Sequence, residues 1–292
     1  MRHTSLWTKS MKHFFIVARE DKDSTLTLIQ SIVDYIGLHG GICSYGVNPD
    51  DSLEEDLVVP PETECILTLG GDGTVIRAAQ NIFGKNIPII GINRGHLGYL
   101  CDLDEESVFE GIDALMSGDY SIEERMMVTG HLIDADGKVG KDIQALNDIV
   151  VCSSAGLQVM HMTVYVNGQY LYAYNCDGII FSTPTGSTAY NLSANGPIVN
   201  PQTNLILLTP INPHTLNARS IVLDPYDELV LEIGVRIEDV PEEAEVSFDG
   251  NHKRLLRPGE KLVVHRAKET TKMIHLKDIS FLDRIRRKLQ AD

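Results

Sequence analysis

The sequence predicts an α/β domain with a parallel, Rossmann-like sheet, followed by a β-rich, sandwich-like domain. Three observations lead to this prediction. Apolar runs of strand length alternate with amphipathic helical stretches between residues 13 and 116. From about Ser121 onward, short β-branched or alternating segments bounded by Gly, Asn, Asp and Pro replace them. Helical spacing returns near the end of the chain, at residues 280–290.

The first half repeats a strand–helix unit. Residues 13–18 predict a buried strand, and the stretch from Asp23 to Ile36 carries apolar side chains at helical spacing. Two further strands are predicted at 64–69 and 87–92, and a helical stretch follows each of them, the second from about Glu105 to Met116. Repetition of this unit implies a parallel sheet with helices packed on it.

The second half contains many short strands and few helices, which is typical of a sandwich. Asn167-Gly168 between two such runs predicts a hairpin. The final helix at 280–290 is too short to be stable alone, so we expect it to dock, back on the first domain, with its basic residues 284–288 on a solvated face. The expected domains are therefore 1–122, 123–276 and the C-terminal helix 277–292. The strand-like segments are 126–133, 143–151, 159–168, 169–174, 178–183, 228–233, 244–248 and 261–266.

Composition excludes several classes of protein. No apolar run approaches the roughly 20 residues that a membrane-spanning helix needs. A net charge of −16, from 41 acidic and 25 basic residues, argues against a nucleic-acid or anionic-membrane partner. The five cysteines include no CxxC pair, which predicts free thiols and a cytoplasmic location. An anionic ligand would need a local device, such as backbone amides or a bound cation.

The run Gly70-Gly71-Asp72-Gly73-Thr74 offers such a device. It joins a buried strand to a predicted helix, where unpaired amides face an anion and glycines let phosphates approach the backbone. An acid within this loop suits a residue that binds Mg²⁺ or takes a proton from an attacking hydroxyl. The alternative is an ordinary strand–helix turn in which Asp72 is only a cap. Neither a Walker loop nor a GxGxxG pattern is present.

Three further segments carry polar groups. The block 177–197 ends a hydrophobic strand in a run of small and hydroxylated residues, which suits a pocket floor for ribose, phosphate or an adenine edge, or else only caps a helix. Asn147-Asp148 stands amid apolar residues and predicts either a solvated edge or a ligand contact. His214, in the segment 213–219, is by itself more typical of a structural histidine.

Taken together, GGDGT, GINRGHLGYL (91–100), the Asn-Asp pair, the block 177–197 and PHTLNAR (213–219) resemble the NAD kinase family, within the diacylglycerol kinase and phosphofructokinase-like superfamily. GGDGT alone is shared with lipid kinases, whereas the block from Asp177 is more specific. Two rival interpretations are a lipid or sugar kinase of the same superfamily and a catalytically inactive dinucleotide sensor.

The resemblance implies an enzyme that moves a phosphoryl group from ATP, or from polyphosphate, to the adenosine 2′-hydroxyl of NAD, giving NADP. It also implies NAD bound between the two domains, Mg²⁺ or another divalent cation held through the donor phosphates, and a homodimer or homotetramer. Asp72 would be the catalytic residue. As candidates for phosphate or ATP contacts we take Gly70, Gly71, Thr74, Arg77 and His214, although Arg77 equally fits a solvated face of its helix. NAD contacts would come from Asp72, Gly73, Asn147, Asp148, Asp177, Thr185, Thr188, Ala189, Tyr190, Asn191, Leu192, Ser193 and Asn251.

The sequence departs from the family pattern at four positions. Asn175 replaces a cationic residue, Gln158 stands where a histidine or arginine is expected, and Asn251 replaces a glutamine after Asp-Gly. Ser220 replaces a proline. These departures concern how the diphosphate is held and whether NADH is also a substrate, and they leave the reaction class unchanged.

Overall fold

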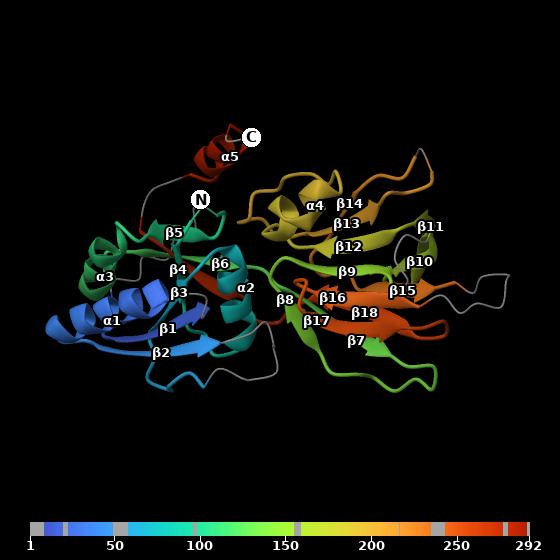
Figure 1. The fold of residues 1–292 in the computed structure, drawn as a ribbon. Helices are drawn as coiled ribbons and strands as arrows, with labels where there is room; N and C mark the ends of the chain where they lie inside the picture. The colour runs from blue at the N-terminus through green and yellow to red at the C-terminus, as the bar shows by residue number, and fades with distance from the viewer. Residues whose placement is uncertain are drawn as a thin grey trace. The chain divides into compact units, whose positions relative to one another are not determined.

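The computed structural model describes residues 9–19, 23–48, 58–95, 98–154, 159–215, 217–234, 243–276 and 280–290. The chain divides into two compact units. Unit 1 comprises Met1–Glu124 and Thr271–Asp292, and unit 2 comprises Arg125–Thr270. Figure 1 shows the ribbon of both units.

Unit 1 is built on one seven-stranded sheet. Its strands are β1 (His13–Arg19), β2 (Ile42–Asn48), β3 (Cys65–Leu69), β4 (Ile89–Asn93), β5 (Cys101–Asp104), β6 (Ser121–Arg125) and β19 (Thr271–His275). The order is β2-β1-β3-β4-β19-β6, and β5 pairs with β4 off this path. The pairs from β2 to β4, and those of β4 with β5 and β19, are parallel, as the alternating pattern predicts.

Helices cover both faces of this sheet. They are α1 (Asp23–Leu38), α2 (Asp72–Asn81) and α3 (Val108–Ser117), with α5 (Phe281–Leu289) near the C-terminus. Ile32 of α1 and Ile112 of α3 share one core with Leu67 of β3. Side chains of a strand alternate between the two faces of a sheet. Ile90 and Ile92 of β4 face this core, so Gly91 between them lies on the opposite face, against Val75 of α2. The expected α/β layers are therefore confirmed.

The end of the chain belongs to unit 1. The expectation that residues up to 276 lie in the second domain is wrong for β19, because Met273 pairs with Ile89 of β4 in the parallel sheet. Helix α5 is assigned to the same unit, as expected. One of its basic residues is not solvated: Arg284 is buried, and its Nη1 donates to the Cys101 carbonyl at 2.9 Å. Arg286 is exposed, whereas the side chains of residues 287 and 288 lie outside the described part.

Arg284 belongs to a buried charge network that ties the C-terminal segment to β5. Its guanidinium pairs with the carboxylate of Asp102, whose other oxygen accepts the Leu276 N–H at 2.8 Å. His275 lies between Asp102 and Glu123, at 3.2 and 3.1 Å. Burial alone would raise the pKa of Asp102, because it disfavours the charged carboxylate. The hydrogen bond and charge of His275, and then the charge of Arg284, outweigh burial and lower this pKa. Against the same burial penalty, the bonds to Asp102 and Glu123 raise the pKa of His275.

Unit 2 is a sandwich of two six-stranded sheets. One sheet has the order β11-β10-β15-β18-β7-β8 and the other β14-β13-β12-β9-β16-β17, and the pairs within each are antiparallel. The strands are β7 (Val128–Ile133), β8 (Ile143–Ala145), β9 (Asp148–Ser153), β10 (Met160–Val166), β11 (Gln169–Cys176), β12 (Gly178–Ser182), β13 (Ile206–Ile211), β14 (Ile221–Leu223), β15 (Leu229–Ile233), β16 (Ala244–Phe248), β17 (His252–Leu256) and β18 (Lys261–Arg266).

One hydrophobic core joins the two sheets of unit 2. Met162 and Leu231 enter it from the first sheet, and Phe181 and Phe248 enter it from the second. The predicted hairpin is confirmed, because Asn167 and Gly168 both have positive φ values, 50° and 75°, between β10 and β11. None of the helices in the described ranges is both long and apolar enough to cross a membrane.

Replacing Asp102 with Asn tests the network at the C-terminal segment. The change leaves the buried Arg284 without its counter-charge and His275 with Glu123 alone, so we expect unfolding to become easier by about 3–5 kcal/mol. Urea denaturation followed by circular dichroism measures this difference. The control is Glu105→Gln, which breaks the more exposed ion pair with Arg94 and should cost at most about 1 kcal/mol.

The penalty of Asp102→Asn should depend on pH. The lowered pKa of Asp102 gives stability that is lost as pH falls from about 3.9, its unfolded value, through the folded pKa. The raised pKa of His275 gives stability that is complete below about 6.5 and lost as pH rises through its folded pKa. The penalty is therefore greatest between these limits. Equal stability of Asp102→Asn and Glu105→Gln at pH 5 would contradict the network.

Candidate functional site

The glycine-rich loop follows β3 and leads directly into α2. Gly70 is required by packing, because a Cβ there would lie 2.3 Å from Thr74 Oγ1. Thr74 is itself buried, so its side chain supports the loop instead of lying open to a phosphate. Gly71 is the N-cap residue, with an extended backbone, and Asp72 is the first residue of the helix. The loop therefore brings the helix N-terminus to the carboxyl end of β3.

Asp72 is held by the backbone of the segment that follows β4. Its Oδ2 accepts the Tyr99 N–H at 2.8 Å, and its Oδ1 accepts the Leu100 N–H at 3.0 Å. Gly98 is in close contact with the same carboxylate, since a Cβ there would lie 1.9 Å from Asp72 Oδ1. Asp72 is not the N-cap residue of its helix, because Gly71 occupies that position and the Asp72 carboxylate accepts hydrogen bonds from the segment after β4.

Gly71 and Gly73 are exposed, and a Cβ on either would meet no atom within 4 Å. Packing within the described protein therefore does not require glycine at these two positions. Because these two residues have no side chains, the first turn of α2 is open on both sides of Asp72. Arg77, the next-turn candidate for a phosphate contact, is partly exposed on the same helix.

In unit 2, antiparallel pairing gathers three strand ends. Ser182 at the end of β12 pairs with Asp148 at the start of β9, and Phe248 at the end of β16 pairs with Ile149. Asp249 follows immediately, and its N–H donates to the Asp148 carbonyl at 2.9 Å. Segments far apart in the sequence thus meet at one edge of the sheet.

Asp249 is a site residue that the sequence analysis missed. Its carboxylate accepts the N–H groups of Leu146, Asn147 and Asp148 at 2.8, 2.7 and 3.0 Å. It adopts a positive φ of 51° in the turn between β16 and β17, in which Asn251 also lies. An Asp-Gly pair between two strand patterns is a turn signal, but nothing in the sequence indicates what its carboxylate binds.

Asp148 does not lie on a solvated edge, which corrects that alternative. Its residue is only 5% exposed, whereas the neighbouring Asn147 is partly exposed. Burial, with a smaller effect from the negative charge of Asp249, raises the pKa of Asp148 to about 7. The carboxyl group therefore titrates near neutral pH, which is a feature of functional sites.

The loop after β12 is fastened to Asn147. Thr183 N–H and Ser182 Oγ donate to the Asn147 carbonyl at 2.8 and 3.3 Å, and Thr183 Oγ1 donates to the Leu146 carbonyl at 2.6 Å. A Cβ on Gly186 would lie 2.2 Å from the Asn147 oxygen, so glycine is required there. The hydroxyl-rich run therefore fixes the Asn147-Asp148 backbone as well as forming a polar surface.

The predicted dinucleotide contacts in this loop differ in exposure. The structure has a 3₁₀ turn at Gly186–Thr188 and the short helix α4 at Tyr190–Ser193. Asn191 is fully buried: its Nδ2 donates to the Ser187 and Pro197 carbonyls at 3.2 and 3.1 Å, and its Oδ1 accepts from Thr209 at 2.7 Å. Its side chain, and that of the buried Thr185, therefore supports the loop from within. Thr188, Ala189 and Leu192 are partly exposed, and Tyr190 and Ser193 are exposed.

Tyr190 lies among the acidic groups of the site. Burial raises the pKa of Tyr190. The charges of the nearby Cys152, Asp148 and Asp177 raise it further. Asp177 accepts the Asn212 side-chain amide at 3.0 Å. The exposed His214 is joined to the same region, because its N–H donates to the Asn175 carbonyl at 2.8 Å. Gln158 lies outside the described residues.

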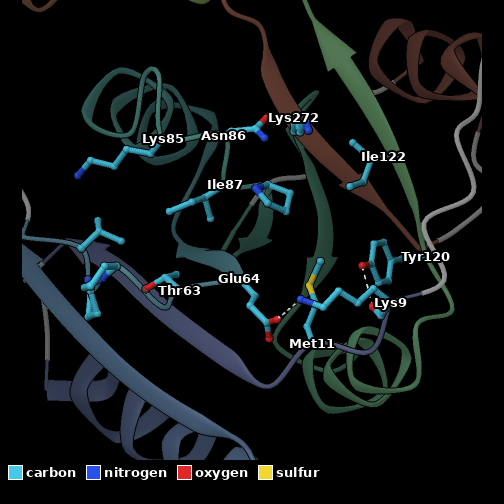
Figure 2. Close-up of a pocket in the computed structure, with 14 residues that line it drawn as sticks. Lys9, Met11, Thr63, Glu64, Lys85, Asn86, Ile87, Tyr120, Ile122 and Lys272 are labelled. Atoms are coloured by element: carbon cyan, nitrogen blue, oxygen red, sulfur yellow. Dashed lines mark hydrogen bonds and ion pairs between the residues drawn. The ribbon is translucent and has the colours of Figure 1, made fainter.

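A cavity of about 600 Å³ lies in unit 1 but contains none of the predicted site residues. It opens at the amino ends of the parallel strands, beside residues that precede β1, β3 and β4, whereas the glycine-rich loop follows a carboxyl end. Figure 2 shows Lys9 reaching Glu64 across it, at 2.6 Å. Ligands of open α/β sheets bind at the carboxyl ends, so the loop remains the better candidate for the chemistry.

Comparisons with known proteins match one family model to each half of the chain. The ATP-NAD kinase N-terminal domain model matches residues 58–120, and the ATP-NAD kinase C-terminal domain model matches residues 146–276. An NAD kinase of Agathobacter rectalis is 44% identical over 96% of this chain and 99% of its own length. An NAD kinase of Lachnospira eligens is 38% identical over 96% of this chain and all of its own length.

Two solved structures share the fold. A yeast NADH kinase complexed with NADH has a TM-score of 0.82 at 21% identity, covering 97% of this chain and 89% of its own. An Archaeoglobus fulgidus NAD kinase in complex with ATP has a TM-score of 0.75 at 21% identity, covering 96% and 99%. Both family models match in order, and they include the glycine-rich loop of one unit and the Asn147-Asp148 edge of the other. The chain belongs to the NAD kinase family.

Proposed function

We propose that this protein transfers the γ-phosphoryl group of ATP to the 2′-hydroxyl of the adenosine ribose of NAD, giving NADP and ADP. The observation that carries the proposal is the Asp72 carboxylate, held by two backbone N–H groups at the open first turn of α2. Membership of the NAD kinase family supports the choice of substrates.

Asp72 serves as the proton acceptor. A ribose hydroxyl is a weak nucleophile, and phosphoryl transfer depends mainly on alignment and neutralisation of charge. Each carboxylate oxygen accepts one backbone N–H, and each keeps a lone pair for a hydroxyl proton. As the 2′-oxygen bonds to the γ-phosphorus, its proton passes to Asp72, and the bond to the β–γ bridging oxygen breaks to release ADP.

The first turn of α2 supplies positive potential to the donor phosphates. The first amides of a helix have no partner within the helix, and its dipole favours an anion at this end. Without side chains, Gly71 and Gly73 let a phosphate come close to these amides. Of the phosphate candidates, Gly70 and Thr74 act through packing, and Arg77 is placed on the same helix.

The loop also fits Mg²⁺ held mainly by ATP. Mg²⁺ is usually bound by one or two carboxylates together with substrate phosphates and water. The loop offers one carboxylate, so Asp72 is the side chain that would hold the ion alongside the phosphates. When bound, the ion would neutralise part of the negative charge on the donor phosphates.

Unit 2 binds the dinucleotide in this proposal. The side chains of Asn147 and Asp148 form hydrogen bonds with ribose hydroxyls. The Asp249 carboxylate accepts the backbone N–H groups of both residues and so keeps them in place. Tyr190, which is 46% exposed, packs on a base, with Asp177 nearby. Thr188, Ala189, Leu192, Ser193 and Asn251 complete the contact surface, while Asn191 and Thr185 position it from inside.

Several finer features belong to the same proposal. All five cysteines lie within the described residues as free thiols, in keeping with a cytoplasmic enzyme. Assembly as a homodimer or homotetramer is expected from the family. Polyphosphate is the alternative donor, and a lipid or sugar kinase and a dinucleotide sensor are the alternative functions that the assay below distinguishes.

The first experiment is a coupled assay with NAD, Mg²⁺ and ATP, in which an NADP-specific dehydrogenase reports NADP. We expect NADP from the wild type and a decrease in kcat of about 10²–10⁴ in Asp72→Asn, because the proton acceptor is lost. Asp34→Asn, a surface change of the same size on α1, is the control. Diacylglycerol or fructose 6-phosphate replaces NAD in parallel reactions. No NADP with either ATP or polyphosphate would refute the proposed activity.

Gly98→Ala should inactivate the enzyme without changing any catalytic group. The new Cβ would overlap the Asp72 carboxylate and displace it, and a displacement of about 1 Å can lower kcat by about 10²-fold. The double variant Asp72→Asn/Gly98→Ala should be little worse than Asp72→Asn alone, because both changes act on one group. Multiplied losses in the double variant would show that Gly98 acts independently of Asp72.

The pH dependence of NAD binding should follow Asp148. An ionised Asp148 accepts ribose hydroxyls better than a neutral one, so kcat/KM for NAD should rise roughly tenfold between pH 6 and pH 8, as expected for a pKa of about 7. Asp148→Asn should lack this rise, whereas Asp34→Asn should keep it.

The stability of Asp148→Asn gives a second test, because the substitution should stabilise the fold although it weakens NAD binding. The raised pKa means that folding favours the protonated group, so its stabilising effect is lost as pH rises from about 3.9 to about 7. Above pH 7, Asp148→Asn should therefore have a higher Tm than the wild type while binding NAD less well. A variant with lower stability at pH 8 would argue against the burial penalty.

A further inference from the structure

A cluster of two histidines and one aspartate lies on the sheet of unit 2 that carries none of the predicted dinucleotide contacts. His131 is on β7, His265 is on β18, and Asp142 directly precedes β8. Strand β7 lies between the other two in the sheet. Two adjacent strands and the residue before a third therefore contribute one residue each.

Strand register places the cluster on one face of the sheet. His131 pairs with Val263, and His265 pairs with Thr129, so the two histidines are diagonal neighbours on adjacent strands. His265 follows Val264, and His131 pairs with Val263, which lies between Leu262 and Val264; the side chains of Leu262 and Val264 lie in the sandwich core. Because side chains alternate along a strand, both imidazoles lie on the outer face, away from that core.

The separation of the donor atoms suits a metal ion. One ligand atom from each residue lies within 4.8 Å of the others, and His131 Nδ1 is 2.9 Å from Asp142 Oδ1. Two donors that each lie about 2.1 Å from one metal ion are roughly 3–3.5 Å apart. His131 and Asp142 are slightly closer than this spacing, so a small separation of the two, with a side-chain rotation of His265, brings all three donors to it.

A second contact orients His265. Its Nδ1 lies 2.9 Å from the Arg266 carbonyl oxygen, which can only accept a hydrogen bond. The proton is therefore on Nδ1, and Nε2 keeps its lone pair. Metal-ligating histidines are commonly held in this way, with the other ring nitrogen donating to a backbone carbonyl. The guanidinium of Arg266 lies over the ring of Tyr226, with its central carbon 5.3 Å from the ring centroid.

We propose that His131, Asp142 and His265 bind a divalent transition-metal ion of the zinc class. Two imidazoles and a carboxylate favour Zn²⁺ over Mg²⁺, which prefers oxygen ligands. The Asp142 side chain is 55% exposed, so the ion has access and water completes its coordination. Bound there, the ion links β18, β7 and β8 and stabilises unit 2, separately from the Mg²⁺ that accompanies ATP.

Equilibrium dialysis of the full chain tests the proposal. The protein is freed of metal with a chelator, dialysed against ZnCl₂ and analysed for zinc by mass spectrometry. We expect the wild type to hold one more equivalent than His265→Gln, with a Zn²⁺ affinity at least tenfold higher, because even changes outside the ligand set cost 10–100-fold. His39→Gln, which alters an exposed histidine of unit 1, should bind zinc as the wild type does.

Thermal unfolding gives a readout that does not depend on catalysis. Zn²⁺ should raise the Tm of the wild type and of His39→Gln, but not that of His265→Gln or Asp142→Asn. Circular dichroism of the metal-free proteins confirms that the variants are folded. Equal zinc binding by wild type and His265→Gln, or a wild type that binds none, would show that His131 and Asp142 form only a hydrogen-bonded pair.

Discussion

Backbone N–H groups hold the carboxylates on which both parts of the candidate site depend. Asp72 accepts two of them from the segment after β4, and Asp249 accepts three from the turn before β9. In a chain with a net charge of −16, backbone amides offset negative charge without adding a cation. The glycine at position 98 follows from this requirement, since a side chain there would displace the Asp72 carboxylate that the amides fix.

The amide contacts of Asp249 also bear on the raised pKa of Asp148. Asp249 takes the amide protons of the turn, so Asp148 is buried beside a second acid and its pKa rises to about 7. A chain selected only for stability would not keep a buried carboxylate of this kind. Asp102 shows the structural solution to the same problem, because His275 and Arg284 surround it and lower its pKa.

Local patterns in the sequence predicted the fold well. The apolar spacing between Asp23 and Ile36 corresponds to the buried face of α1, and Asn167-Gly168 forms the expected hairpin turn. Errors arose where distant segments meet: β19 and Arg284 join strands that precede them by more than 180 residues. For the candidate site, motifs indicated Asp72 and Asp148. The burial of Asp148, the inward-facing side chain of Asn191 and the contacts of Asp249 do not follow from residue type or spacing.

The discontinuous first unit has a consequence for synthesis on the ribosome. Strand β19 stands between β4 and β6 in the sheet, yet it is made after all of unit 2. The nascent chain can therefore fold residues 125–270 while the position between β4 and β6 is still open. During that interval β6 and the part of β4 that does not pair with β5 present unpaired edges, which are prone to pairing with other chains. Premature termination after unit 2 would leave that vulnerability permanent, even though every residue of the glycine-rich loop had been made.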